Sequence, residues 1–217
     1  MLPDYIERHG HLPIRVIKYP VDLRNVITDM DIRPMLWSGE KRVYDSTAKK
    51  REKIQIDAML HLGMSSSDYW RIEKRARRDG YDWVGDDGSA LPKHNGGKGE
   101  RWAGLPEELM PFFDVEGIAQ QLHDQLSVSM ARYILGREAR LTMAYKDIPT
   151  DTSRDAGLKY CEFIFYTSLA TLHRRNDQAR VEFLHHPGKK TAEEDIQKGA
   201  DVAQFVICSM IDQLGGM

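Results

Sequence analysis

Six polar and basic side chains within residues 66–78 have types and spacing suited to contacts with phosphates and base edges. They are Ser66, Ser67, Arg71, Lys74, Arg75 and Arg78. Arginine presents a planar fork of donors that matches the acceptors of guanine or of a phosphate, and short serines permit close approach. If these residues lie on one helix, the positive end of the helix dipole adds to their attraction for phosphate. We therefore predict that these six side chains bind DNA.

The charge distribution along the chain supports this prediction. The 217 residues contain 31 Lys and Arg against 33 Asp and Glu, which gives a net charge of −2. Residues 41–80, however, contain eleven basic and six acidic side chains, so this stretch carries +5 and the remainder −7. A local positive field on an otherwise acidic chain is typical of a module that meets phosphates. The alternative interpretation is a solvated helix face with no ligand.

The apolar pattern around these residues predicts two short helices joined by a turn. The apolar positions of the first are spaced four residues apart over residues 54–62, and Gly63 follows as a stop. The second begins at Ser65 and Asp68, which have capping-box spacing, and continues through residues 69–76. Two helices around a glycine turn, the second one basic, indicate a helix-turn-helix. The alternative is an αα-hairpin whose basic face is simply exposed to water.

The stretch from residue 55 to residue 83, with the core LGMSSSDYWRIEKRARRDGYDW, resembles the helix-turn-helix of Mu-like phage small terminase subunits. The resemblance implies that residues 62–65 form the turn and that Arg71, Lys74 and Arg75 face DNA. It covers 29 of 217 residues. It therefore supports a DNA-binding helix-turn-helix better than it supports a terminase.

The rest of the chain predicts a mainly α fold with four parts. Residues 1–45 contain four prolines and are expected to form an irregular or β-containing N-terminal arm. Residues 46–84 are the helix-turn-helix module. Residues 85–104 contain six glycines and are expected to be a linker or loop. Residues 105–217 are predicted to be a helical oligomerisation domain.

Three helical segments are predicted within residues 105–217. The first is capped by Asp114 and ends at Gly136, and the last runs from Thr191 to Leu214. The middle segment starts at Thr152 and runs to Leu172. Its aromatic part, residues 160–166, also fits a buried strand, so both interpretations stay open there.

No catalytic residue, metal ligand or cofactor site is predicted. Cys161 and Cys208 lie in apolar stretches and are interpreted as buried free thiols, although a nucleophilic pair of Cys161 with His173 stays open. His185 and His186 lack the spacing of a metal site and are expected to be loop residues.

These observations predict a non-catalytic protein that binds double-stranded DNA and assembles as a homo-oligomer. It would be a small-terminase-like subunit acting with a packaging motor, or a regulator acting with the transcription machinery. The alternatives are a structural or assembly protein whose basic hairpin contacts a protein partner, and an enzyme with a dispersed active site. No apolar run reaches the length of a membrane span, so a cytoplasmic protein is expected, in the host cytoplasm if the chain is viral.

Overall fold

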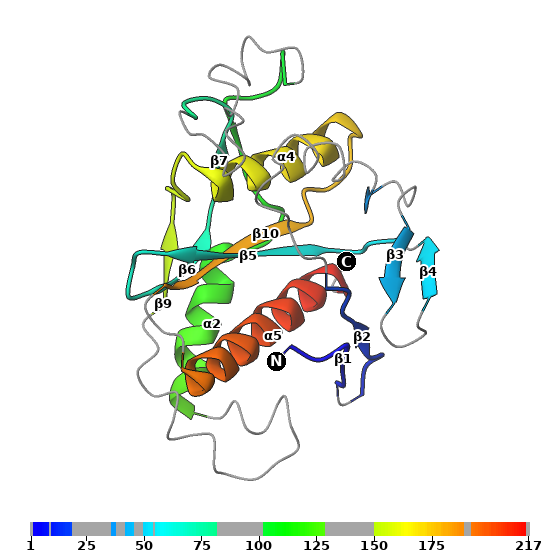
Figure 1. Ribbon diagram of the computed structural model, residues 1–217, viewed down its shortest axis with the longest axis vertical. Coiled ribbons are helices and arrows are strands. Elements are labelled where there is room, and N and C mark those ends of the chain that lie inside the picture. Colours follow the sequence, from blue (N-terminus) through cyan, green and yellow to red (C-terminus); the bar gives the residue numbers. More distant parts are fainter. Residues whose placement is uncertain are drawn as a thin grey trace.

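The protein is an α/β structure built around one mixed sheet (Figure 1). The computed structural model describes residues 2–8, 10–18, 36–37, 42–45, 50–53, 55–81, 102–128, 150–188 and 192–215. Its strands are β1 (Tyr5–Ile6), β2 (Ile14–Arg15), β3 (Arg42–Asp45), β4 (Lys50–Lys53), β5 (Met59–Ser65), β6 (Trp70–Glu73), β7 (Ala76–Arg77), β8 (Glu108–Leu109), β9 (Thr150–Ser153) and β10 (Val181–Pro187). Its helices are α2 (Val115–Val128), α4 (Tyr160–Arg174) and α5 (Glu193–Gly215).

The central sheet has the strand order β5-β10-β6-β9. Strand β10 runs parallel to β5, from Val181 opposite Met59 to Pro187 opposite Ser65, and antiparallel to β6. Strand β6 in turn runs parallel to β9. Six of the seven residues of β10 are buried, as expected for a central strand that helices cover on both faces.

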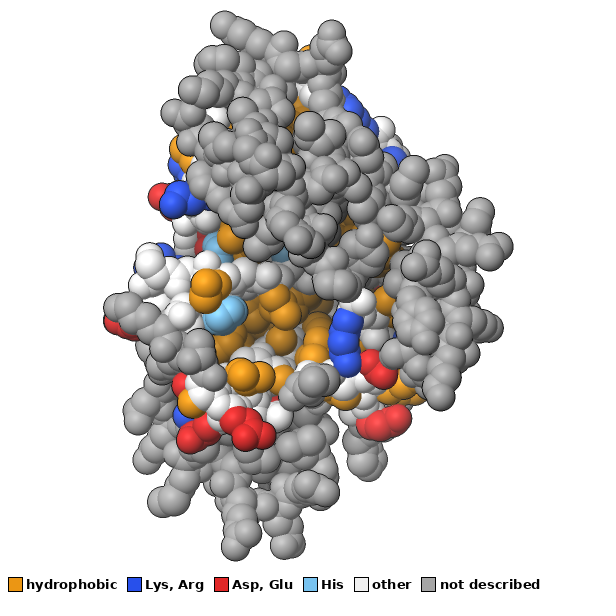
Figure 2. Space-filling model, in the orientation of Figure 1, with side chains coloured by type: hydrophobic (Ala, Val, Ile, Leu, Met, Phe, Trp, Pro, Cys, Tyr) orange, Lys and Arg blue, Asp and Glu red, His pale blue; other side chains and the backbone are white. Residues whose placement is uncertain are grey.

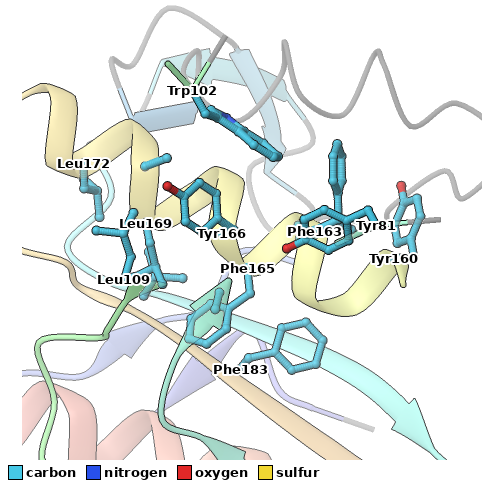
Figure 3. Packing of buried hydrophobic residues seen from close by; sticks show 14 of the residues in the cluster. Tyr81, Trp102, Leu109, Tyr160, Phe163, Phe165, Tyr166, Leu169, Leu172 and Phe183 are labelled. Carbon is cyan, nitrogen blue, oxygen red and sulfur yellow. The ribbon is translucent and has the colours of Figure 1, made fainter. Parts of the chain in front are cut away.

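Helix α4 packs on one face of this sheet, and α2 and α5 pack on the other (Figure 1). The α4 side holds an aromatic core in which Trp102 lies 5.2 Å from Phe163 and 4.9 Å from Tyr166, between ring centroids (Figure 3). Nine consecutive residues of α4, 162–170, are buried, because the helix lies between the sheet and the segments around Tyr81 and Trp102.

The second core lies between the sheet and helices α2 and α5. Its sheet residues include Trp70, Ile72 and Leu184. On this side of β5, Leu62 and Met64 are exposed, and the space-filling view shows an apolar hollow beside β5 and over α5 (Figure 2). Among the described residues, no helix is both long enough and apolar enough to cross a membrane.

The prediction of a mainly α fold with a helix-turn-helix is wrong. Residues 59–65 and 70–73 form strands β5 and β6 of the sheet, and residues 66–69 form the connection between them. The physical reason is that a spacing of four residues also places side chains on one face of a strand, because four is an even number. All seven residues of β5 pair in register with β10, and of the three apolar positions in the predicted pattern only Leu62 lies within this strand.

Two of the predicted helices are present with shifted ends. Helix α2 starts after Asp114, whose Oδ1 accepts the backbone N–H of Gly117 at 3.0 Å, and α5 covers most of the predicted last helix. The middle helix begins at Tyr160 rather than Thr152, because residues 150–153 pair with β6 as strand β9. The predicted end at Gly136 lies outside the described residues.

The predicted division into four parts stays a prediction. Strands β5 and β6 precede the glycine-rich residues 85–104, strands β9 and β10 follow them, and all four share one sheet. The glycine-rich residues themselves lie outside the described part of the chain, except residues 102–104.

Candidate active site

Cys161 lies at the N-terminal end of α4, where it is partly exposed and not part of a disulfide. It packs over strand β5 at Gly63. A Cβ atom on Gly63 would lie 3.1 Å from Sγ of Cys161 and 2.7 Å from the ring of Phe183. The absence of a side chain at Gly63 therefore makes the room in which the thiol sits. The N-terminus of a helix favours negative charge, and this is an environment that activates a thiol.

His185 on β10 lies beside this thiol and hydrogen-bonds it. Its Nδ1 atom is 2.8 Å from Oε1 of Glu73 on β6, and both side chains are almost completely buried, with exposed fractions of 5% and 1%. The carboxylate thus accepts the Nδ1 proton, and the other ring nitrogen is left for Cys161. This contact fixes the orientation of the imidazole.

Burial alone lowers the pKa of His185, but the hydrogen bonds to Cys161 and Glu73 and their negative charges outweigh it. Together they raise the pKa to about 9. The imidazole is therefore protonated at neutral pH, in the state that donates a proton.

Sheet register explains why three residues so far apart in sequence meet. His185 pairs with Gly63 on β5 and with Arg71 on β6. Gly63, over which the thiol packs, therefore lies at the same level of the sheet as the imidazole. Glu73 lies two residues after Arg71 on the same strand and therefore on the same face. Cys161 reaches this level from α4, which packs on that face.

A thiol, an imidazole and a carboxylate in this order form the arrangement used for nucleophilic acyl transfer. Histidine activates and protonates, the carboxylate orients the histidine, and cysteine attacks. No group of three or more His, Cys, Asp or Glu side chains suited to a metal ion occurs among the described residues.

The six predicted DNA-binding residues lie at the sheet and its connections. Ser66 and Ser67 lie in the β5–β6 connection, and Arg71 lies on β6. Lys74 pairs with Glu116 at 2.6 Å and Arg75 pairs with Glu108. Arg78 pairs with Asp79 at 3.0 Å. No observation tests a DNA contact by these side chains, so their assignment stays a prediction.

Sequence reasoning missed Glu73, Cys161 and His185 as a group. It interpreted Cys161 as a structural thiol, and the pairing that it left open was with His173, which is exposed in the last turn of α4. It also placed His185 in a loop, whereas His185 is a buried residue of β10. The available signal was the stretch VEFLHHP, which has the length of a strand and contains apolar and β-branched side chains.

Comparison with known proteins identifies the fold. No family model and no curated protein matches the chain. Among solved structures, the pyrrolidone carboxyl peptidase from Thermus thermophilus has a TM-score of 0.57 and 20% identity, and the match covers 95% of this chain and 86% of that one. The enzyme from Thermococcus litoralis has a TM-score of 0.53 and 16% identity, with 72% and 66% covered. A mutant of the Pyrococcus furiosus enzyme has a TM-score of 0.51 and 17% identity, with 71% and 69% covered.

The chain therefore has the α/β fold of pyrrolidone carboxyl peptidases. This similarity, over nearly the whole chain in the first case, overturns the resemblance to a phage small terminase and the predicted DNA-binding function. The predictions of double-stranded DNA as a partner, and of a packaging motor or the transcription machinery, are therefore wrong as well. The homo-oligomer stays a prediction. The prediction that the chain is not an enzyme is also wrong, since the fold is that of peptidases, and Cys161 of α4 lies beside His185 of β10, which contacts Glu73 of β6.

Proposed function

We propose that this chain is a cysteine peptidase that hydrolyses an amide bond through Cys161, His185 and Glu73. The observation that carries the proposal is that His185 contacts both the thiol and a buried carboxylate, 2.8 Å away, at the N-terminus of a helix. Structural cysteines lack such partners, whereas reactive ones have a cation and a helix N-terminus beside them.

In the proposed reaction, the Cys161 thiolate adds to the substrate carbonyl carbon, and the C–N bond breaks. The leaving nitrogen takes the proton of the His185 imidazolium, which produces a free amine and a thioester. Water then adds to the thioester and gives a proton to His185, the C–S bond breaks, and the acid is released. Glu73 keeps the imidazole aligned and stabilises its positive charge throughout.

The acyl group that we propose is an N-terminal pyrrolidone carboxyl group. The support is the fold shared with pyrrolidone carboxyl peptidases, together with a nucleophile that the fold presents at the sheet surface. We further propose that the enzyme acts in the cytoplasm, because a catalytic thiol stays reduced there.

Two measurements test the proposal. The first is hydrolysis of pyrrolidone-carboxyl aminomethylcoumarin by the wild-type chain and by Cys161→Ser, which we expect to lose about three orders of magnitude or more in kcat/KM. The matched control is Cys208→Ser, because burial raises the pKa of Cys208 to about 11 and keeps that thiol unreactive. The second is the rate of iodoacetamide alkylation at each cysteine, read by mass spectrometry. Equal rates at Cys161 and Cys208, or full activity in Cys161→Ser, would refute the nucleophile assignment.

A further inference from the structure

Arg71 occupies the position next to the catalytic histidine. It lies directly opposite His185 in the antiparallel pairing of β6 with β10, and beside Asp151 of β9. Residues directly opposite each other in a sheet lie on the same face, with Cβ atoms about 4.5–5.5 Å apart. Gly63, His185, Arg71 and Asp151 therefore form one row across the sheet, with the thiol above its Gly63 end.

One donor of the Arg71 guanidinium has no hydrogen-bond acceptor among the described residues. Its Nε atom is buried and has no hydrogen-bond partner among the described residues. The next arginines along the chain differ, because Arg75, Arg77 and Arg78 each bind a carboxylate. A guanidinium is always charged, and a buried donor without an acceptor costs free energy.

Neither of the two carboxylates nearest in the sheet binds Arg71 among the described residues. Oε1 of Glu73 lies 2.8 Å from Nδ1 of His185, and Oε2 of Glu73 is buried without a hydrogen-bond partner among the described residues. Asp151 Oδ1 accepts the backbone N–H of Thr152 at 2.8 Å, and Asp151 is exposed. No ion pair joins either of them to Arg71 in the described part of the chain. The acceptor that Arg71 lacks is therefore expected to come from a ligand.

The reaction geometry defines which part of the substrate reaches Arg71. The leaving nitrogen takes its proton from His185, so it lies over the imidazole. The thiol and the acyl group occupy the Gly63 side of that ring, and the substituent on the nitrogen extends to the other side, where Arg71 lies. In an amino acid, the α-carboxylate is two bonds of about 1.5 Å each from the nitrogen. This places a carboxylate within reach of the guanidinium.

We propose that Arg71 binds a carboxylate of the leaving group and makes the enzyme select substrates whose leaving amino acid carries a negative charge. The inference rests on the proposed function for the order of thiol, imidazole and leaving group. A planar guanidinium binds a carboxylate through two parallel hydrogen bonds, which is why arginine rather than lysine suits this position. Either a free α-carboxylate or an acidic side chain supplies this chemistry, and the experiment separates them.

The test uses three pyrrolidone-carboxyl compounds that differ only in the leaving group: alanine, alanine amide and glutamate amide. A charged hydrogen bond contributes about 1.5–3 kcal/mol, so the wild-type kcat/KM should favour one acid over the neutral amide by about tenfold to hundredfold. Preference for alanine identifies the α-carboxylate, and preference for glutamate amide identifies the side chain. Arg71→Met should erase the preference and still hydrolyse alanine amide, whereas Arg71→Lys should retain part of it.

A second readout does not depend on the acyl group. Iodoacetate and iodoacetamide alkylate the same thiol with loss of iodide, and they differ in having a carboxylate or a neutral amide. Arg71→Met should lower the ratio of their rates at Cys161 by about tenfold. The matched control is Arg174→Met, which removes the same charge from an exposed position in the last turn of α4.

The outcomes separate the two proposals. A wild-type chain that hydrolyses none of the three compounds, but whose alkylation ratio falls in Arg71→Met, refutes the proposed acyl group and supports the carboxylate site. An unchanged ratio in Arg71→Met, with wild-type circular dichroism, overturns the role of Arg71 whatever the acyl group. A wild-type preference for alanine amide over both acids overturns it as well.

Discussion

Replacing Arg77 by methionine is expected to destabilise the protein strongly, because it leaves a buried carboxylate without its partner. The Glu162 side chain is completely buried, directly after the nucleophile. Arg77 gives it three hydrogen bonds, from the backbone N–H (2.9 Å), Nε (2.7 Å) and Nη2 (2.7 Å). The hydrogen bond to Glu162 also raises the pKa of Arg77, although burial acts in the opposite direction.

Two routes give the size of the effect. Removing one member of a buried ion pair costs about 3–5 kcal/mol. Alternatively, the Glu162 carboxyl of the variant takes up a proton and becomes neutral. For a carboxyl with an ordinary pKa of about 4.3, this costs about 3–4 kcal/mol at pH 7. Arg77 also forms an ion pair with Asp155, whose side chain is 72% exposed, and this pair contributes little to stability. We therefore expect a loss of about 3–4 kcal/mol in the free energy of unfolding.

The assay is urea unfolding of three variants at pH 7 and pH 5. Arg77→Met should lose about 3–4 kcal/mol at pH 7 and less at pH 5, where protonating the carboxyl costs less. Arg77→Met combined with Glu162→Met should recover most of the loss, since apolar replacement of a buried pair is often neutral. The control is Arg75→Met, whose partner Glu108 is 44% exposed, with an expected change below about 1 kcal/mol. A loss in Arg77→Met no larger than in the control, or no recovery in the double variant, would refute the reasoning.

Three further predictions concern titration and packing. Because the pKa of His185 is raised to about 9, kcat/KM should fall as the pH rises through about 9. Glu73→Gln should move this fall to lower pH, and a pH profile of kcat/KM measures both. Gly63→Ala brings a Cβ atom to 3.1 Å from the nucleophile sulfur and should lower kcat at least tenfold, whereas Gly215→Ala, in open space, should leave kcat unchanged. Burial raises the pKa of Glu182, so its contribution to stability is lost as the pH rises from about 4.5. Glu182→Gln should therefore raise the urea midpoint more at pH 9 than at pH 5, and an equal change at both would contradict it.

The sequence was sufficient to predict the two amphipathic helices in the second half of the chain, α2 and α5. Helix α2 has a capping residue, Asp114, and apolar side chains at helical spacing, and α5 has three acids in its first turn. These signals are local, since a cap and a dipole act within one turn. Both helices lie on the same side of the sheet and expose one face to water, which is the condition for a clear helical period.

The strands could not be predicted with the same local reasoning. In residues 59–65 the apolar and polar side chains alternate imperfectly, because His61 and Gly63 face the active site and Leu62 and Met64 are exposed. The site itself depends on pairings between residues more than a hundred positions apart, such as His185 with Arg71. Spacing along the chain carries no record of that register, so the sequence alone does not bring Glu73, Cys161 and His185 together as a group.

Part of the positive charge in residues 41–80 forms ion pairs within the fold, which explains in part why the predicted DNA-binding function was wrong. Lys74, Arg75 and Arg77 each pair with acids of residues 108–162, which come later in the chain. A local charge surplus therefore ties β6 and β7 to α2, β8 and α4 within one fold. Unlike Arg75, Arg77 and Arg78, Arg71 has no carboxylate partner among the described residues. Its neighbour in the sheet is His185, the histidine of the proposed active site, so this charge lies where we propose that a substrate carboxylate binds.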